Sequence, residues 1–540
     1  MTYQTAERKC GRMKKILSLL CLAAAAVFCS GATEFPQLNP FSCTSIMVGK
    51  KASTDGAVIT SHTCDSHYRT WVEIVESIEY ANDTTVNVFK NRLHTESAKG
   101  SYRMSLKGSI FQPAGKTFRF VDTAYPCMNE KQLAMGETTI SGRRDLVNPD
   151  GMFMIEELEK IALQRCSTAR DAIRLMGELI EEYGYGDWGE CLTIADKNEV
   201  WHFEVFGEGK DNIGGVWAAV RVPDDHVGVS ANIPRISTLD LKDTDNYMAS
   251  DNVFEVAKKL GYWDGKETFR FWKAYGGGRK AFSVREYYIL NKLAPSLGLE
   301  YDSEELPLTV KPEHAVSAEE VMALLSETYE GSEFDVTRNL LVEVKDRETG
   351  EVDTVLSPAA NPWMSRDTRN LLNALKPGAV DGYRLVAVPQ CAYSTVIELH
   401  SDLPDDIGGV LWLGFDNPAQ SPRIPVYCGT TSLPDCFSIC GQYGYDENSI
   451  IWKFRTANKL ATVRWGATKD QINEAVQYFR DKGTREEAFV RDQYEQILAA
   501  EGQDAARAFL TGYTADFAGA TILAWEELAL RFWSMFARGF

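Results

Sequence analysis

Paired β-hairpin patterns constrain the fold of this chain more than any other feature. Between 191 and 231, CLTIAD and VWHFEVF flank one polar turn, and VWAAVRV and HVGVSAN flank a second at 223–225. Hairpins of this kind build antiparallel sheets. A third hairpin pattern runs from Cys43 to Asp65, where two short β-rich runs flank Asp55-Gly56, a pair that tolerates positive φ. We therefore expect antiparallel sheet in the core.

Helical patterns fill most of the remaining chain. Residues 153–164 carry apolar side chains at helical spacing, and Thr168 begins a second helix with a capping-box-like start. Helices and loops are expected over 240–380, followed by strands in RLVAVP, STVIEL and GVLWLGF at 384–415. Strands at both ends with helices between and after them predict a layered α+β core.

The C-terminal part reads as helices only. From Thr468 onward we predict helices that begin at Thr468 and at Thr484. The last of them, TILAWEELALRFWSMF at 521–536, is strongly apolar on one face. Such a face predicts docking on the rest of the protein rather than contact with a membrane or with a second copy.

Charge excludes one class of partner. The 540 residues carry a formal net charge of −19, and binding to nucleic acid or to an anionic membrane needs basic patches. None is found beyond the N-terminus, so we expect no nucleic-acid partner.

The first 42 residues look like material that is removed. Residues 13–32 have a basic start, an apolar centre and small residues before a cut after Ala32, which is a secretory signal pattern. The less favoured alternative is a lipoprotein that is anchored to a membrane by a lipid on Cys29. It is less favoured because a small residue is expected just before a lipidated cysteine, and this chain has Phe28 there. Thr33–Ser42 is then a propeptide or, alternatively, a disordered mature N-terminus.

Removal up to Ser42 would make Cys43 the first residue, and a cysteine there carries its own base. A free α-amine has an unperturbed pKa of about 7.7–8.0, so near neutral pH part of it can accept the thiol proton. Nine of the 12 cysteines would remain, and an odd number suggests one free thiol. Cys436 and Cys440 stand four apart and no CxxC occurs, so we expect no zinc site.

The chain resembles the N-terminal-nucleophile cysteine dipeptidases, relatives of the penicillin V acylases and bile-salt hydrolases. The likeness starts at the Cys43–Asp65 hairpin and extends in register to about residue 465. Its further segments are Met128-Asn129-Glu130-Lys131, TARDAIRLMGELIEEYG at 168–184, WGECLTIADKNEVWHFEVFG and VWAAVRVPDDHVGVSANIPRI between 188 and 236, ETYEGSEFD at 327–335 and IPVYCGTT at 424–431.

The resemblance implies a four-layer αββα fold of the α+β class. The expected organisation is a signal peptide over 1–32, a propeptide over 33–42, a catalytic domain over 43–465 and a helical extension over 466–540. The implied activity is that of an exported, self-processed dipeptidase. Two alternatives stay open, an N-acyl amidohydrolase of the penicillin V acylase or bile-salt hydrolase type and a catalytically inactive exported binding protein.

The resemblance also implies site residues. Cys43 is the nucleophile, Asp65 orients its amine, and Asn232, in the segment Ser230-Ala-Asn-Ile-Pro234, supplies an oxyanion donor. The acylases carry Arg-x-x-Asp where this chain has His62-Thr-Cys-Asp65, so His62 is either a stand-in for the guanidinium or a polar neighbour.

One further position departs from the acylase pattern, and another has a candidate match. The second oxyanion Asn has no clear counterpart, so Thr139 or a backbone N–H is expected to replace it. The acylase site also contains an arginine from late in the chain, and we expect its counterpart at Arg455, with Lys453 as the alternative. The ordinary interpretation of these two residues is a solvated helix face.

The implied chemistry needs no cofactor and no metal. A short peptide is the expected substrate, no stable membrane insertion is expected after signal removal, and a homo-oligomer is left open.

Overall fold

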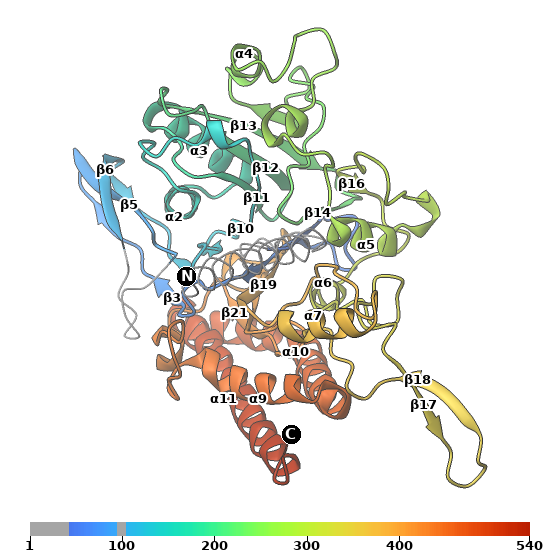
Figure 1. Ribbon diagram of the computed structural model, residues 1–540. Helices are drawn as coiled ribbons and strands as arrows, with labels where there is room; N and C mark the ends of the chain where they lie inside the picture. The colour runs from blue at the N-terminus through green and yellow to red at the C-terminus, as the bar shows by residue number, and fades with distance from the viewer. Residues whose placement is uncertain (1–42, 94–103, 540) are drawn as a thin grey trace, which may run out of the picture. The chain divides into compact units, whose positions relative to one another are not determined.

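The computed structural model describes residues 43–93 and 104–539 (Figure 1). The predicted signal peptide, the predicted propeptide and the alternative lipid anchor at Cys29 lie outside the described residues. Within the described part, two antiparallel sheets carry the core, as the hairpin patterns predict.

The first sheet contains the strand that follows Cys43. Its order is β16-β14-β1-β2-β19-β20-β21. The predicted hairpin forms β1 and β2, although the two strands share only the ladder pair Val48↔Ile59, while the other edge of β1 pairs along its length with β14. The Ser61 hydroxyl on β2 accepts from the Ile46 N–H at 2.8 Å in place of a backbone carbonyl. The strands are β1 (Ser45–Val48), β2 (Val58–Asp65), β14 (Val227–Ser230), β16 (Thr309–Val310), β19 (Cys391–Leu399), β20 (Gly409–Phe415) and β21 (Ile424–Tyr427).

The second sheet holds the first of the two hairpins predicted over 191–231, formed by β11 and β12. The prediction of the second hairpin was wrong: β13 lies in this sheet beside β12 and β15, whereas β14 crosses to the first sheet, where it pairs with β1 and β16. The order of the second sheet is β15-β13-β12-β11-β10-β9-β8-β3. The strands from β10 to β13 are antiparallel neighbours. A short turn joins β11 to β12, whereas residues 140–188 separate β10 from β11 in the chain. The strands are β3 (Glu73–Val75), β8 (Phe120–Asp122), β9 (Met128–Asn129), β10 (Ala134–Thr139), β11 (Gly189–Ala195), β12 (Val200–Gly207), β13 (Gly215–Val222) and β15 (Tyr247–Ala249).

The two sheets pack face to face. The Thr60 and Thr193 hydroxyl oxygens lie 2.6 Å apart across the interface, one on β2 and the other on β11. At Gly136 on β10 the backbones approach so closely that a Cβ atom would lie 2.2 Å from the carbonyl oxygen of Ser61. Only glycine permits this contact, which places β10 directly against β2.

Helices cover the outer faces. On the second sheet lie α2 (Ile155–Arg165) and α3 (Ala169–Tyr183), where Gly177 lets α3 approach Trp217 of β13. On the first sheet lie α6 (Ala318–Leu325), α9 (Ile450–Val463), α10 (Trp465–Glu501) and α11 (Gln503–Met535). The order helix, sheet, sheet, helix confirms the expected four-layer αββα fold (Figure 1).

The apolar face of α11 docks on the protein, as predicted. Trp525 and Phe532 are fully buried, and the indole N–H of Trp525 donates to the carbonyl oxygen of Gln420 at 3.2 Å. No helix among the described residues is long and apolar enough to cross a bilayer.

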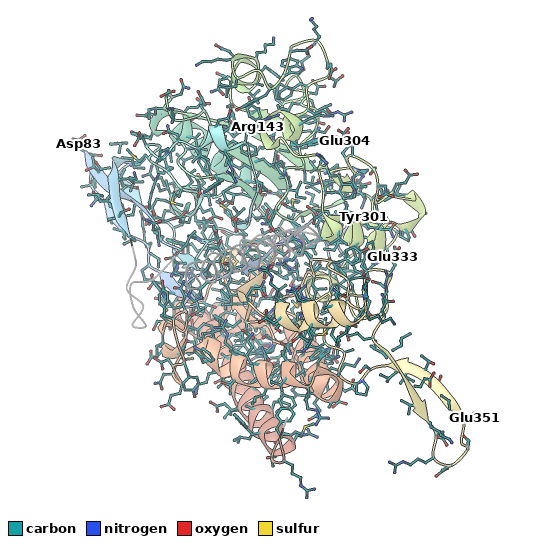
Figure 2. All side chains as sticks on the ribbon, viewed as in Figure 1. Asp83, Arg143, Tyr301, Glu304, Glu333 and Glu351 are labelled. Atoms are coloured by element: carbon teal, nitrogen blue, oxygen red, sulfur yellow. The ribbon has the colours of Figure 1, made fainter. Side chains whose placement is uncertain are left out.

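Smaller elements complete the fold. The helices are α4 (Val253–Lys259), α5 (Val284–Leu293), α7 (Arg366–Leu375) and α8 (Asp405–Gly408), with single turns at Arg144–Leu146, Trp272–Gly276, Pro295–Leu297 and Asp435–Ser438. Two-stranded ribbons pair β4 (Glu79–Tyr80) with β7 (Gly115–Lys116), β5 (Thr84–Lys90) with β6 (Ser105–Gln112), and β17 (Leu341–Lys345) with β18 (Val352–Leu356). Figure 2 shows Glu351 near the tip of the last ribbon, away from the core.

Three further local predictions were wrong. The segment RLVAVP at 384–389 forms no strand. The β17–β18 ribbon was not foreseen, because its residues are mostly exposed and lack a buried apolar face. Thr484 begins no helix; α10 runs through it, and its hydroxyl donates back to the carbonyl oxygen of Arg480 at 3.3 Å.

Candidate active site

Cys43 is buried just before β1, and its backbone is held on both sides. Its N–H donates to the side-chain oxygen of Asn232 at 2.8 Å. Its carbonyl oxygen accepts a hydrogen bond from the Arg285 guanidinium at 2.6 Å. With Ser42 still attached, this nitrogen is an amide, and the geometry fixes the peptide group at the predicted cleavage point.

Asn232 follows β14 in a left-handed conformation, with φ of 65°. An asparagine tolerates this region better than most residues. Its Oδ1 accepts from Cys43 and from Arg285, and its Nδ2, which carries two N–H groups, donates one to the carbonyl oxygen of Thr139 at 2.6 Å. The structure therefore brings Asn232 and Thr139 together beside Cys43.

Arg285 was not predicted as a site residue. It lies in the first turn of α5, which begins with a capping box between Ser283 and Glu286. The fully buried guanidinium also donates to the Thr44 hydroxyl at 3.1 Å and to the carbonyl oxygen of Ala231 at 2.8 Å. Burial, together with the nearby Arg384, lowers its pKa to about 10, so it remains a cation at neutral pH.

Asp65 lies at the end of β2 and is fully buried. Its Oδ2 accepts from the Thr63 hydroxyl at 2.9 Å and from the Arg384 guanidinium at 3.0 Å. Its Oδ1 is buried and has no hydrogen-bond partner among the described residues. Burial raises the pKa of this carboxyl, and Arg384 only partly opposes the shift.

His62 lies on β2 opposite the edge of β10. Strand β9 pairs with β10 only at Ala134, so the backbone of Glu137 is left at an open edge. The Nδ1 atom of His62 lies 2.5 Å from the Glu137 carbonyl oxygen and 3.3 Å from its N–H. Burial lowers the pKa of His62 to about 4, so the imidazole is neutral near pH 7 and the cation beside Asp65 is Arg384.

A pair of buried carboxyls adjoins the thiol. Ligand atoms of Cys43, His62 and Glu137 lie within 4.8 Å of one another. Glu137 accepts from the Thr139 hydroxyl at 2.9 Å, and its carboxyl interacts with that of Glu190 on the neighbouring strand. Burial raises the pKa of Glu137 to about 7 and that of Glu190 well above its usual value.

The thiol itself is protonated in this arrangement. Burial, and then the nearby Glu137, raise the pKa of Cys43 well above its ordinary value. Attack by Cys43 on a carbonyl therefore requires a base that removes the thiol proton.

Comparison with known proteins places the chain in a family. The profile of Peptidase family C69 matches residues 42–478. The chain belongs to this peptidase family. The match begins at the residue before Cys43 and includes the segments that surround the thiol.

Relatives of this C69 peptidase share its length. A "Probable dipeptidase" of Latilactobacillus sakei is 24% identical over 496 residues, which cover 88% of this chain and 92% of the relative. "Dipeptidase A" of Lactobacillus helveticus is 22% identical, covering 80% and 83%. Among solved structures, penicillin V acylase from Agrobacterium tumefaciens aligns with a TM-score of 0.26 and 11% identity, covering 71% of this chain and 86% of the acylase.

In the C69 peptidase, the ion pair of Arg455 within the described residues is with a carboxylate outside the group above. It lies on α9, where its guanidinium pairs with Asp416 at 2.7 Å. Lys453, the alternative, pairs with Glu526 at 2.7 Å.

Sequence reasoning missed Arg285, Arg384, Glu137 and Glu190. A capping box does mark the helix start at Ser283, but nothing in the sequence reveals that α5 points its first turn at Cys43.

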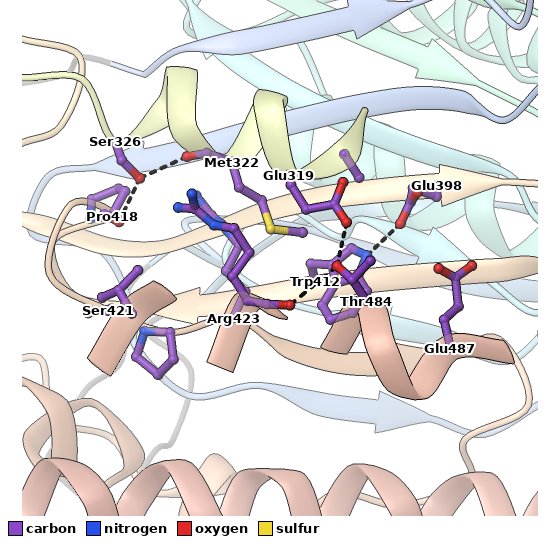
Figure 3. A pocket seen from close by; sticks show the side chains of 14 residues that line it. Glu319, Met322, Ser326, Glu398, Trp412, Pro418, Ser421, Arg423, Thr484 and Glu487 are labelled. Carbon is purple, nitrogen blue, oxygen red and sulfur yellow. Dashed lines mark hydrogen bonds between the residues drawn. The ribbon is translucent and has the colours of Figure 1, made fainter. Parts of the chain in front are cut away.

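A small cavity lies elsewhere, between α6 and α10 on the outer side of the first sheet (Figure 3). Glu319, Trp412, Arg423 and Thr484 are among its lining residues, and Glu398 accepts from the Trp412 indole at 2.6 Å. Its volume of about 30 Å³ is room for little more than a water molecule. It is too small for a peptide.

The nine described cysteines are all free thiols. Two groups of side chains could hold a cation by geometry, Cys43 with His62 and Glu137, and Asp55 with Glu398 and His400. The first would accept zinc by donor type, and it overlaps the predicted nucleophile.

Proposed function

We propose that this C69 peptidase is an exported dipeptidase whose nucleophile is the thiol of Cys43, freed as the N-terminal residue by self-processing. The proposal is based chiefly on two hydrogen bonds of the Cys43 backbone. Its N–H donates to Asn232, and its carbonyl oxygen accepts from Arg285. The relatives named dipeptidases and the family match over 42–478 support the substrate class. The predicted signal pattern over 13–32 supports export.

Processing begins with attack of the Cys43 sulfur on the carbonyl carbon of Ser42. The C–S bond forms, the Ser42–Cys43 C–N bond breaks, and the departing nitrogen takes up the proton that the thiol has lost. Water then hydrolyses the thioester, which releases a carboxylate at Ser42 and regenerates the thiol. The product is an α-amine at the position where Asn232 Oδ1 now binds the amide N–H.

The freed amine serves as the base. An α-amine has an unperturbed pKa of about 7.7–8.0, so part of it is neutral near pH 7, in contrast to the thiol, whose pKa burial raises. Asp65 lies with an unpartnered Oδ1 near Cys43 and can accept from the amine, while Arg384 fixes its other oxygen. These contacts orient the amine toward the sulfur.

Peptide hydrolysis follows the same course. The thiolate attacks the scissile carbonyl, and the oxyanion is held by the second N–H of Asn232 Nδ2 with a backbone N–H. The α-ammonium gives its proton to the leaving amine, and water activated by the amine hydrolyses the thioester. No step needs a metal, so dialysis against a chelator should leave the activity unchanged.

The mass of the N-terminal peptide of the purified protein tests the proposal. We expect Cys43 as the first residue, and retention of Thr33–Ser42 in Cys43→Ala. A panel of free dipeptides and acyl amides then tests the substrate class. Active enzyme that keeps the segment before Cys43, or preferred turnover of acyl amides, would contradict the corresponding part of the proposal.

A further inference from the structure

The carboxyls of Glu137 and Glu190 form a shared group beside the nucleophile. Glu137 and Thr139 are two residues apart on β10, and Glu190 is the register partner of Thr139 on β11, so the three side chains share one face of the sheet. Both carboxyls are buried, and a ligand atom of Glu137 lies within 4.8 Å of the Cys43 sulfur.

The pair lacks a cation. Among the described ion pairs, neither carboxyl has a lysine or arginine partner; the single contact is with His62 at 3.9 Å, and that ring is neutral near pH 7. The other groups that act on the pair include Asp187 and Glu159, which are acidic as well. A buried carboxylate without a compensating charge is costly, which favours a site that a cation completes.

Unused acceptors support the same conclusion. The Oε2 atoms of Glu137 and Glu190 are both buried, and no lysine, arginine, amide or hydroxyl group of the described residues donates to them. Besides the Thr139 hydroxyl, the groups that bond to Glu137 are the Glu190 carboxyl and the Cys43 thiol. Buried polar atoms in proteins are usually satisfied. The two oxygens therefore offer acceptors for a donor that arrives with a ligand.

Bond lengths put the ammonium group of a dipeptide within reach of this pair. In a peptide the α-nitrogen lies about 2.5 Å from the carbonyl carbon of its own residue. A sulfur poised for attack lies roughly 3–3.5 Å from that carbon. The ammonium nitrogen is thus within about 6 Å of the Cys43 sulfur, the zone in which the Glu137 carboxyl lies.

We propose that the Glu137–Glu190 pair binds the free α-ammonium of the substrate's N-terminal residue and so restricts cleavage to the bond that follows that residue. This inference rests on the proposed function of Cys43. An N-acylated substrate brings no charge and leaves the acceptor oxygens unpaired, so the pair selects peptides with a free amino terminus over acyl amides.

The test compares three substrates on the processed enzyme: a free dipeptide, its N-acetyl derivative and its desamino analogue. In Glu137→Gln and Glu190→Gln, kcat/KM for the free dipeptide should fall about tenfold or more, since a hydrogen bond to a charged group is lost. The desamino analogue should change less than about threefold. The ratio of kcat/KM for the free dipeptide to kcat/KM for the N-acetyl and desamino substrates should therefore fall in both variants.

Glu398→Gln is the matched control. Glu398 is also a buried carboxyl on a core strand, but it bonds to Trp412 beside the small cavity of Figure 3. This variant should keep the wild-type preference. Melting temperatures and N-terminal masses of all three variants distinguish loss of recognition from loss of folding or processing.

The outcomes separate the two proposals. Wild-type enzyme that prefers acyl amides contradicts the proposed function itself. Wild-type enzyme that prefers free dipeptides, with the preference intact in both Gln variants, overturns only the role of the pair. If neither Gln variant cleaves the Ser42–Cys43 bond, the pair is required for self-processing, and its role as the site for the substrate ammonium is overturned.

Discussion

Two buried aspartates of this protein, Asp416 and Asp65, are paired with arginine and nevertheless differ in the direction of their pKa shifts. At Asp416, burial alone would raise the pKa, but Lys459 and Arg455 outweigh it and hold the pKa below its usual value. At Asp65, burial prevails over Arg384 and the pKa is raised.

The difference lies in how completely each carboxylate is satisfied. Asp416 accepts from Arg455 at 2.7 Å, from Lys459 at 3.1 Å and from Asn458 at 3.1 Å, so both of its oxygens are bound. Asp65 has one oxygen bound and the other without a partner. A saturated pair stabilises the fold, whereas an unsaturated carboxylate next to Cys43 retains an acceptor for chemistry.

The largest effect is expected when Asp65, the carboxylate with an unbound oxygen, is replaced, and it is an effect on kcat. Asp65→Asn keeps the shape but cannot stabilise the α-ammonium that forms during the reaction. We expect kcat to fall roughly 10²- to 10⁴-fold on free dipeptides, with the melting temperature close to that of the wild type. Unchanged kcat in fully processed Asp65→Asn would assign this residue to the fold alone.

Asp416→Asn should show the opposite pattern. Removing one partner of a buried ion pair leaves Arg455 and Lys459 uncompensated, and the free energy of unfolding should fall by about 3–5 kcal/mol. Denaturant titration measures the loss, while kcat of the folded fraction should stay within about threefold of the wild type. A large loss of kcat with unchanged stability would place the Arg455 pair in the catalytic machinery after all.

Asn232→Ala tests the contact between the nucleophile and its oxyanion donor. Loss of one such donor usually lowers kcat by roughly 10²–10³-fold. Because Asn232 also bonds to Cys43 and Arg285, the N-terminal mass and the melting temperature are measured in parallel. A change in kcat below about threefold in folded, processed enzyme would limit Asn232 to a turn-forming role.

Much of the architecture could be predicted because it depends on local patterns. Of the two hairpins predicted over 191–231 the first formed, as β11 and β12, and the second did not, while Cys43, Asp65, Asn232, His62 and Thr139 came together around β1, β2 and β10. The family likeness supplied those positions. Periodicity alone predicted layers of sheet and helix.

The guanidinium groups of the site could not be predicted, because tertiary packing decides which arginines reach it. Arg285 stands 242 positions from Cys43 and reaches it only because α5 packs beside β14. Arg384 lies in a segment that was predicted as strand and instead runs irregularly past Asp65. Likewise Glu137 gains its acidic surroundings only from the pairing of β10 with β11.

The smallest expected effect concerns His62. Its folded pKa of about 4 lies below the unfolded value of 6.5, so its neutral form is favoured by folding, and stability from this group is lost as the pH falls from about 6.5 to 4. Between pH 6 and 8 the ring carries no charge in the resting enzyme, and Asn or Ala at this position carries none either. We therefore expect the shape of the pH–rate profile to be the same in wild type, His62→Asn and His62→Ala.

The two substitutions should differ in stability instead. Asn can place a polar atom near the position of Nδ1 and keep a contact with the backbone of Glu137 at the open edge of β10, whereas Ala leaves that buried backbone unpaired. An unsatisfied buried group costs about 1–3 kcal/mol, so His62→Ala should unfold at lower denaturant concentration than His62→Asn. A pH–rate profile that shifts in His62→Ala while its stability stays unchanged would give the imidazole a catalytic charge and contradict its role as a partner of the β10 edge.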